Sequence, residues 1–137
     1  MNAFAVGDAV VVFAIGFSIR IVWSATLRAD GPLALAIDPL DWNACLRRAG
    51  ERGWTITQIV NTHEHRDHTD GNAEVVRATG ATVLAHAGAA ARIGGVDRGL
   101  VAGDVIRVGR TVELECLDTP GHTLTHVCLL AHGQENA

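Results

Sequence analysis

The pattern of apolar and polar positions divides this 137-residue chain into short strands and helices. The clearest helix is predicted over residues 41–52, where apolar residues recur at the i, i+3, i+4 and i+7 positions of one helix face. These positions are Trp42, Cys45, Leu46 and Ala49. Asp41 is suited to cap the helix N-terminus, and Gly53 to end the helix. We therefore expect a surface helix with one buried face.

Short apolar runs bounded by turn residues predict the strands of the fold. We expect strands at residues 24–28, 33–37, 55–60, 82–85, 105–108, 111–117 and 127–130. Turn-forming residues at 29–32 and at 109–110 favour two hairpins. Further helices are expected at residues 72–79 and 87–93, so strands and helices alternate through the middle of the chain. This alternation is typical of an α/β fold, in which a sheet of βαβ units is covered by helices.

The first 24 residues contain an apolar run at positions 9–19 that permits three interpretations. A membrane-spanning helix needs about 20 apolar residues, but Arg20 interrupts this run early. A secretory signal needs positive charge before its apolar core, and the only charged residue there is Asp8. The Val, Ile and Phe content favours one or two strands, so neither membrane insertion nor export is expected. We treat residues 1–17 as a separate apolar segment and residues 18–137 as the domain.

Composition narrows the function classes before any motif is considered. A net charge of −4 and a pI near 5.9 give no basic surface, so nucleic acid is not an expected partner. Apolar residues make up 48% of the chain, which is enough for the core of one domain. The three cysteines have no C-x-x-C spacing, which argues against a disulfide framework and fits a reducing cytoplasm. We expect Cys45, Cys116 and Cys128 all to be small core residues.

Residues 62–72 carry the candidate chemistry of the chain, because three histidines and three carboxylates gather there. Imidazole and carboxylate ligands suit zinc, iron or manganese. His63 and His65 are two positions apart and Asp67 and His68 are adjacent, so the four cannot share one helix face. The stretch is therefore predicted to be a loop that follows a buried strand. Such a loop can direct the first pair to one metal and the second pair to another, about 3.5–4 Å away.

Two motifs give the chain a family resemblance. Residues 62–68 read T-H-x-H-x-D-H, and residues 119–123 read T-P-G-H-T. In this order, the two motifs resemble those of the metallo-β-lactamase superfamily. The strand end at residues 37–39, together with His126 four positions after His122, is most similar to the glyoxalase II-like branch, the hydroxyacylglutathione hydrolases. The resemblance implies an αββα sandwich, truncated here to its N-terminal half.

The resemblance assigns His63, His65 and His122 to a first metal, and Asp67 with His68 to a second. It implies two Zn²⁺ ions in an intact site, with iron or manganese as alternatives. Asp67 would both bind its metal and orient the attacking hydroxide, so it is the candidate catalytic residue. The implied reaction is hydrolysis of a small-molecule thioester linked to glutathione, which releases a 2-hydroxy acid and glutathione.

Five other polar residues near the motifs need an interpretation. Asp38 either supports a ligand from below or only forms a turn before the helix. Asp70 either caps the following helix or adds a ligand, and capping is favoured. Glu64 and Arg66 alternate with the ligands and are expected to face away from the metals. His86 follows a strand and is expected to be a partly buried polar residue, not a ligand.

The resemblance covers residues 18–133, but only the N-terminal half of a family domain. A bridging aspartate and a further histidine, which the family carries after T-P-G-H-T, have no counterpart before Ala137. The resemblance places His126 under the turn and not on a metal. We therefore expect a truncated chain in which one apolar sheet face is exposed.

Two alternatives to the hydrolase stay open. A mononuclear iron persulfide dioxygenase uses the same two motifs, with His63 and His122 as ligands and a later aspartate as the third. A non-catalytic half-domain would need another polypeptide chain to complete its fold. Metal identity separates the first alternative from the hydrolase, and a size measurement separates the second.

Overall fold

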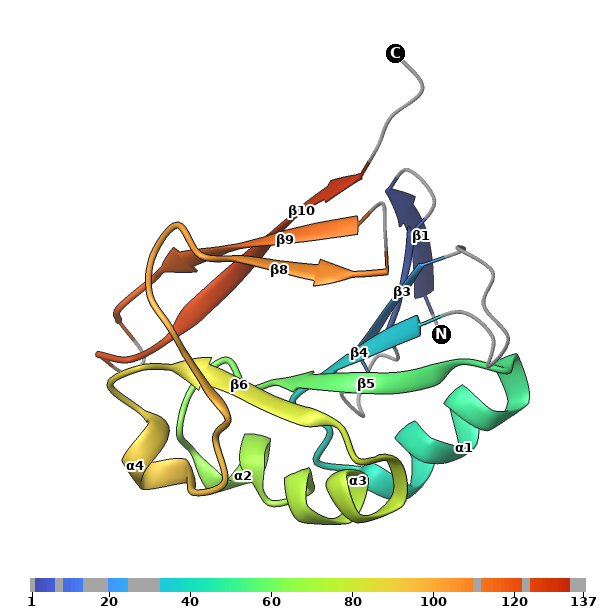
Figure 1. Cartoon of the computed structure of the whole chain (residues 1–137), viewed down its shortest axis with the longest axis horizontal. Coiled ribbons are helices and arrows are strands. Elements are labelled where there is room, and N and C mark those ends of the chain that lie inside the picture. Colours follow the sequence, from blue (N-terminus) through green and yellow to red (C-terminus); the bar gives the residue numbers. More distant parts are fainter. Residues whose placement is uncertain are drawn as a thin grey trace.

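The structure is a computed structural model that describes six stretches of the chain: residues 2–6, 9–13, 20–24, 33–109, 112–121 and 124–133. The described residues form three layers (Figure 1). Helices cover one face of a large sheet, and a smaller sheet packs against the opposite face. This arrangement corresponds to three consecutive layers of the predicted αββα sandwich.

The large sheet contains seven described strands in the order of the sequence. They are β1 (Asn2–Val6), β2 (Ala9–Phe13), β3 (Arg20–Ser24), β4 (Leu33–Ile37), β5 (Thr55–Val60), β6 (Thr82–His86) and β7 (Arg98–Leu100). Strands β1 to β4 pair antiparallel, and β4 to β7 pair parallel. Parallel neighbours need a crossover connection, and helices supply it here. The predicted βαβ organisation is therefore confirmed.

The helices are α1 (Trp42–Arg52), α2 (Arg66–Thr69), α3 (Asn72–Thr79) and α4 (Ala90–Ile93). Helix α1 connects β4 to β5, and α3 connects β5 to β6. The short α2 immediately precedes α3, and α4 lies in the connection from β6 to β7. All four helices lie on the same side of the large sheet (Figure 1).

The small sheet consists of β8 (Val105–Val108), β9 (Val112–Asp118) and β10 (Val127–Gly133), paired antiparallel in the order β10-β9-β8. Alternate residues of β9 are buried, as the period of two in its sequence predicts. The opposite face exposes Val105 and Leu130, at 40% and 46%. Glu115 pairs with both of these apolar residues, and Glu113 pairs with Arg107 beside them, so the exposed surface is mixed and not uniformly apolar.

Strands β4, β5 and β6 bury side chains on both faces, as expected for parallel strands between two layers. The core on the helix side includes Ala34, Ala36, Cys45, Ala49, Ile59, Val75 and Val83. The core between the sheets includes Leu35, Val60, Leu84, Ile106, Leu114 and Cys116. Neighbouring residues of one strand thus belong to different cores, which fixes the register of the sheet.

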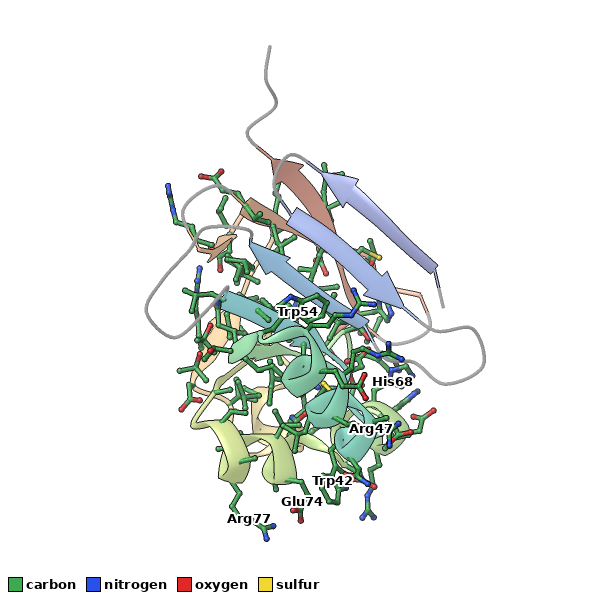
Figure 2. All side chains as sticks on the ribbon, turned by 90° about the vertical axis from the view of Figure 1, so that its right-hand side faces the viewer. Trp42, Arg47, Trp54, His68, Glu74 and Arg77 are labelled. Atoms are coloured by element: carbon green, nitrogen blue, oxygen red, sulfur yellow. The ribbon has the colours of Figure 1, made fainter. Side chains whose placement is uncertain are left out.

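Helix α1 confirms the helix predicted over residues 41–52. The Asp41 carboxylate accepts a hydrogen bond from the Ala44 backbone N–H at 3.1 Å, and Gly53 ends the helix at φ 70°. The prediction that Trp42 belongs to the buried face is wrong, because Trp42 is 38% exposed. In the first turn, its side chain projects toward the helix N-terminus and away from the sheet. Figure 2 shows Trp42 on the outer side of the helices and Trp54 between α1 and the sheet.

Several element boundaries differ from the prediction. The strand that pairs with β4 is β3, four residues before the predicted 24–28, and residues 25–32 with the predicted turn lie outside the described residues. The described residues among the first 24 form three strands instead of one or two. The three-residue β7 was not predicted, because its sequence contains Gly99 and is too short to show a period. The division at residue 17 stays a prediction.

Two of the three cysteines are buried as predicted. Cys45 lies in the core on the helix side, and Cys116 in the core between the sheets. The prediction is wrong for Cys128, which is exposed because it points from β10 to the outer face of the small sheet. Within the described ranges, no helix is long and apolar enough to cross a membrane.

Candidate metal centre

The histidine loop, residues 61–72, joins the carboxyl end of β5 to α3. The chain bends at residues 62–64, and His65 is extended, with φ −63° and ψ 139°. The next four residues form the single turn of α2, so the prediction of a continuous loop is wrong there. Within this turn, His68 Nε2 lies 3.7 Å from Asp67 Oδ2. The bend and the turn together bring the centroid of the His63 ring to 4.8 Å from that of His65 and 4.1 Å from that of His68.

A buried pair of asparagines closes the histidine loop at its base. Asn72 Nδ2 donates to Asn61 Oδ1 at 2.5 Å, and Asn61 Nδ2 donates to Asn72 Oδ1 at 3.1 Å. Asn61 Nδ2 also donates to the backbone oxygen of His68 at 3.3 Å. Beside this pair, a Cβ atom at Gly71 would lie 1.8 Å from the backbone oxygen of Pro39. Only glycine therefore permits the loop to approach the end of β4 so closely.

Asp38, directly after β4, is the buried anchor of the loop. Its carboxylate accepts hydrogen bonds from the Thr62 backbone N–H at 2.8 Å, from Thr62 Oγ1 at 2.6 Å and from His68 Nδ1 at 2.9 Å. The residue is 1% exposed and has φ 47°, a conformation that is uncommon outside glycine. Of the two interpretations that the sequence left open, support of the histidines is therefore confirmed. The hydrogen bonds offset the cost of burying the carboxylate.

The proton positions on His63 follow from the hydrogen bonds of Thr62. The Thr62 hydroxyl has one proton, and it donates that proton to Asp38 Oδ2, which has none. Thr62 Oγ1 can then only accept from His63 Nδ1, which lies 2.9 Å away. This network assigns the proton of neutral His63 to Nδ1 and leaves the Nε2 lone pair available to a metal.

The surroundings of His63 favour its neutral form. The residue is 3% exposed, and burial holds the pKa of its imidazole below the ordinary value. The neighbouring His68 lowers the pKa of His63 further, while Asp38 acts in the opposite direction. The His63 and His68 ring centroids are 4.1 Å apart. A neutral imidazole is the form that binds metals, so these surroundings suit a ligand.

Two groups of three donor residues are arranged as metal ligands in the described part of the chain, and they share His63. The first group is Asp38, His63 and His68, and the second is His63, His65 and Asp67. Within each group, one donor atom per residue lies within 4.8 Å of the others. His68 Nε2 lies 3.7 Å from Asp67 Oδ2 and so adjoins the second group. The Asp67 side chain is 72% exposed, so this side of the cluster is open to solvent.

The donor set fits a divalent metal ion. Two atoms that bind one zinc ion at about 2.0–2.2 Å lie at most about 4.4 Å apart, close to the separations in the second group. Neutral imidazole with one carboxylate is also the ligand chemistry that zinc prefers. Asp38 already accepts three hydrogen bonds, so it serves to orient His68 and is not itself the carboxylate ligand.

The segment that follows the second motif lies against the histidine loop. The Val127 backbone N–H donates to the Thr62 backbone oxygen at 2.8 Å, and the His126 ring stacks on the His63 ring with centroids 5.0 Å apart. Thr119 Oγ1 lies 3.0 Å from His126 Nδ1. His126 belongs to neither donor group, in agreement with the position predicted for it. His122 lies outside the described residues, so its assignment stays a prediction.

Glu64 belongs to neither donor group, and its orientation away from the metals stays a prediction. Its side chain is only 13% exposed and binds two residues that are distant in sequence, Arg92 and Thr125. No local pattern in the sequence indicates these contacts, because the partners lie 28 and 61 positions away. Arg66 behaves as expected, since its side chain is 89% exposed and pairs only with Asp70 among the described contacts.

The remaining candidates are not metal ligands in this arrangement. The prediction that Asp70 caps α3 is wrong, because Gly71 occupies that N-cap position and Asp70 ends α2. Asp70 also belongs to neither donor group. His86 is partly buried, as predicted. Its Nδ1 accepts a hydrogen bond from the Gly88 backbone N–H at 2.8 Å, and its Nε2 lies 3.6 Å from Asp118 Oδ1.

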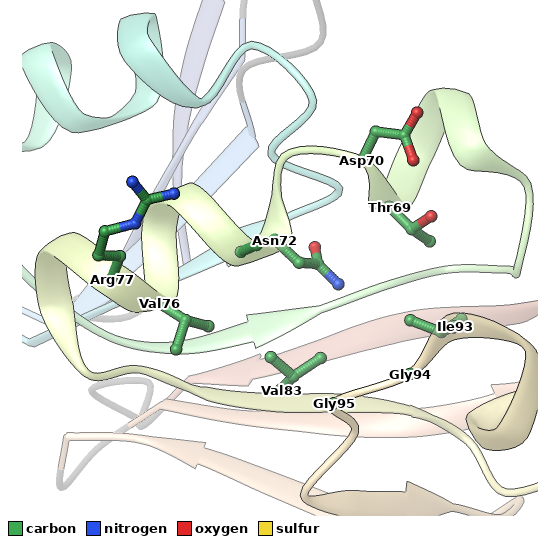
Figure 3. Close-up of a pocket in the computed structure, with 10 residues that line it drawn as sticks. Thr69, Asp70, Asn72, Val76, Arg77, Val83, Ile93, Gly94 and Gly95 are labelled. Carbon is green, nitrogen blue, oxygen red and sulfur yellow. The ribbon is translucent and has the colours of Figure 1, made fainter.

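A pocket of about 570 Å³ lies beside the base of the histidine loop, on the helix side of the large sheet (Figure 3). It is lined by Thr69, Asp70, Asn72, Ala73, Val76, Arg77, Val83, Ile93, Gly94 and Gly95. None of these residues belongs to a donor group. The pocket is therefore separate from the candidate metal centre.

A model of the metallo-beta-lactamase superfamily matches residues 25–135, which include both motifs and all residues of the two donor groups. The chain belongs to the metallo-beta-lactamase superfamily. The two donor groups support metal binding by this chain, and metal binding is a property of this superfamily.

Among the members of the superfamily, the chain is similar to hydroxyacylglutathione hydrolases. That of Polaromonas sp. (strain JS666 / ATCC BAA-500) is 64% identical over 104 residues, which are 76% of this chain and 40% of that protein. That of Nitrosococcus oceani is 56% identical over 98 residues, 72% of this chain and 37% of that protein. The predicted similarity to this branch is confirmed, and the chain spans about 40% of the length of such relatives.

Solved structures share the fold of this chain. ETHE1 from Myxococcus xanthus superimposes with a TM-score of 0.70 at 26% identity, covering 96% of this chain and 54% of that chain. BJP-1, a subclass B3 metallo-beta-lactamase of Bradyrhizobium japonicum, gives 0.73 at 22% identity, covering 99% of this chain and 58% of that chain. At such identities the second comparison supports the fold alone. The predicted metallo-β-lactamase-type fold is confirmed.

Proposed function

We propose that this chain carries metal ligands of a hydrolase that cleaves glutathione thioesters into a 2-hydroxy acid and glutathione. The observation that carries the proposal is the 64% identity to a hydroxyacylglutathione hydrolase over a region that contains the histidine loop. The geometry supports it, because neutral His63 and the carboxylate of Asp67 meet in one donor group. Cytoplasmic location also stays a prediction, as does association with another chain.

We assign the proposed ligands as the two motifs suggest. His63, His65 and His122 would hold a first zinc ion, and Asp67 with His68 a second. When bound, the zinc ions would lower the pKa of a coordinated water and polarise the thioester carbonyl.

The other side chains of the loop prepare these ligands. Thr62 keeps the His63 proton on Nδ1, and Asp38 accepts the hydrogen bond from His68 Nδ1, so each ring presents Nε2. Asp67, whose side chain is 72% exposed, would orient the attacking water. Hydrolysis then adds water across the C–S bond, which yields the carboxylic acid and the thiol.

Zinc content and thioester hydrolysis test the proposal on the 137-residue chain. We expect up to two equivalents of zinc, together with hydrolysis of a lactoyl-glutathione thioester. The variant His63→Ala should lose both. Arg66→Ala is the matched control, because Arg66 lies in the same loop with a side chain that is 89% exposed, and both properties should persist.

Two results would contradict the proposal. Hydrolysis that is unchanged in His63→Ala would remove the histidine loop from the reaction. One equivalent of iron without zinc would instead favour the mononuclear iron alternative.

A further inference from the structure

Three consecutive residues of the histidine loop face three consecutive residues before and at the start of β10, in antiparallel order. The Thr62 backbone oxygen accepts from the Val127 N–H at 2.8 Å. The next pair is His63 with His126, whose rings stack at 5.0 Å. The third is Glu64 with Thr125, where the Thr125 hydroxyl donates to Glu64 Oε2 at 2.6 Å. The histidine loop and the segment that follows the second motif are therefore docked along each other.

The Glu64 pair is the outermost of the three contacts and the only one that involves a side-chain charge. Arg92 in α4 donates from Nη1 to Glu64 Oε1 at 3.1 Å, so each carboxylate oxygen has its own partner. The Glu64 side chain is 13% exposed, whereas that of Arg92 is 61% exposed. A largely buried carboxylate is stable only when it is paired and hydrogen-bonded, so these two partners determine where Glu64 can lie.

Thr125 is held from its other side by the connection between β6 and α4. It is 8% exposed, and a Cβ atom at Gly88 would lie 2.9 Å from Thr125 Cγ2. The segment that runs from Gly88 into α4 thus contacts the Glu64–Thr125 pair twice, through Gly88 and through Arg92. Removal of the Glu64 carboxylate would leave a buried hydroxyl without its acceptor between these elements.

We propose that Glu64 is a positioning residue that docks residues 124–127 onto the histidine loop and thereby sets the metal affinity of the centre. Glu64 lies between His63 and His65 in sequence, and Thr125 lies three positions after His122. One carboxylate therefore ties the segment that carries two candidate ligands to the segment that follows the third. The inference rests on the metal centre of the proposed function and assigns Glu64 no contact with the metal or the substrate.

The first test measures docking in the metal-free chain. Hydrogen exchange of the Val127 amide reports the contact with Thr62, and the Asn61 amide, which donates to the Leu84 backbone oxygen at 2.9 Å, is the internal reference. In Glu64→Ala we expect Val127 to exchange at least about tenfold faster while Asn61 is unchanged. Thr125→Val should accelerate Val127 in the same way.

The second test measures zinc affinity against a competing chelator. Glu64→Ala should raise the zinc dissociation constant by about 10–100-fold and alter the visible spectrum of bound Co²⁺. Glu64→Gln keeps an oxygen that can accept from Thr125, so its effect should be smaller. In the double variant Glu64→Ala/Thr125→Val, the loss should be less than the product of the single losses, because both changes break one contact.

Glu74→Ala is the matched control. Glu74 also pairs with an arginine, Arg77, but on the outer surface of α3 (Figure 2). It should change neither Val127 exchange nor zinc affinity. The inference would be overturned if Glu64→Ala left Val127 exchange or zinc affinity unchanged. Equal effects of Glu64→Ala and Glu74→Ala would overturn it as well. A wild-type chain that binds no zinc would instead refute the proposed function, and Val127 exchange would still decide the docking role of Glu64.

Discussion

The helix side of the large sheet and the base of the histidine loop at its edge are both buried, but by opposite kinds of side chain. The helix side is filled by alanine, valine and isoleucine side chains that are at most 7% exposed. The loop is held by Asp38, Asn61 and Asn72, which are equally hidden and joined to their partners by hydrogen bonds. Apolar contacts are non-directional, whereas a buried polar group that loses its partner costs its full desolvation free energy. The core should therefore tolerate changes that the loop does not.

The largest expected effect comes from the point where loop and core meet. Gly71→Ala would place a methyl group 1.8 Å from the Pro39 backbone oxygen, and backbone atoms cannot rotate away as a side chain would. We expect the free energy of unfolding to fall by more than about 3 kcal/mol in urea denaturation. Gly50→Ala is the control, because nothing lies within 4 Å of a Cβ at that helical position. It should raise stability by up to about 1 kcal/mol. A Gly71→Ala chain as stable as wild type would show that the loop does not approach Pro39 so closely.

A pair of substitutions separates the two regions directly. Ile59→Ala removes a fully buried side chain from the core on the helix side and should cost about 2–5 kcal/mol of unfolding free energy. Its zinc dissociation constant should stay within about threefold of wild type. Asp38→Asn keeps the side-chain size but replaces one accepting oxygen by a donor, so it cannot keep both the bond from the Thr62 N–H to Oδ1 and the bonds from Thr62 Oγ1 and His68 to Oδ2. Its zinc dissociation constant should rise about 10–100-fold.

The comparison fails if the two variants behave alike. Equal losses of zinc affinity, measured with a competing chelator under conditions where circular dichroism shows both variants folded, would mean that core and loop are one cooperative unit. Stability and affinity would then be inseparable properties of this half of the fold.

The same contrast explains which features could be predicted from the sequence. Apolar periodicity is a local signal, so α1, β5 and the βαβ order were predicted with correct types. The histidines were also recognisable, because ligand types crowd into one stretch. The contacts of Glu64, in contrast, depend on Arg92 and Thr125, which only the folded chain brings near. Glu64 lies between two candidate ligands, His63 and His65. From the sequence alone, a charged residue at this position can either face solvent or join two segments of the fold.

Boundaries failed for related physical reasons. Trp42 has the right spacing for the buried face, but its place in the first helical turn directs it outward. Asp70 is a suitable capping residue, yet α3 begins after Gly71, because the close contact with Pro39 fixes where the chain turns. In both cases, tertiary geometry overrode a correct local preference.

The pH dependence of stability tests whether the loop buries His63 in its neutral form. Burial holds the pKa of His63 below its ordinary value, so the unfolded chain binds a proton there before the folded chain does. Stability from this residue is therefore present above the unfolded pKa, about 6.5, and is lost as the pH falls toward the lower folded pKa, by at most about 1.4 kcal/mol per pH unit. With metal removed by chelation, wild type should lose stability between pH 7.5 and 5 more steeply than His63→Gln. Parallel curves for the two proteins would show that His63 takes no part.

The smallest effect concerns the thiols, which report the two cores without disturbing them. Burial raises the pKa of Cys45 to about 12, with a contribution from the Asp41 carboxylate, and burial likewise raises the pKa of Cys116. Because the thiolate is the reactive form, a thiol reagent at pH 8 should modify only the exposed Cys128 quickly. Cys128→Ser should remove this fast phase, and all three thiols should react in denaturant. Fast reaction at Cys45 in the folded chain would mean that the core on the helix side opens readily. The apolar core would then be the less stable of the two regions, and the hydrogen-bonded loop the more stable.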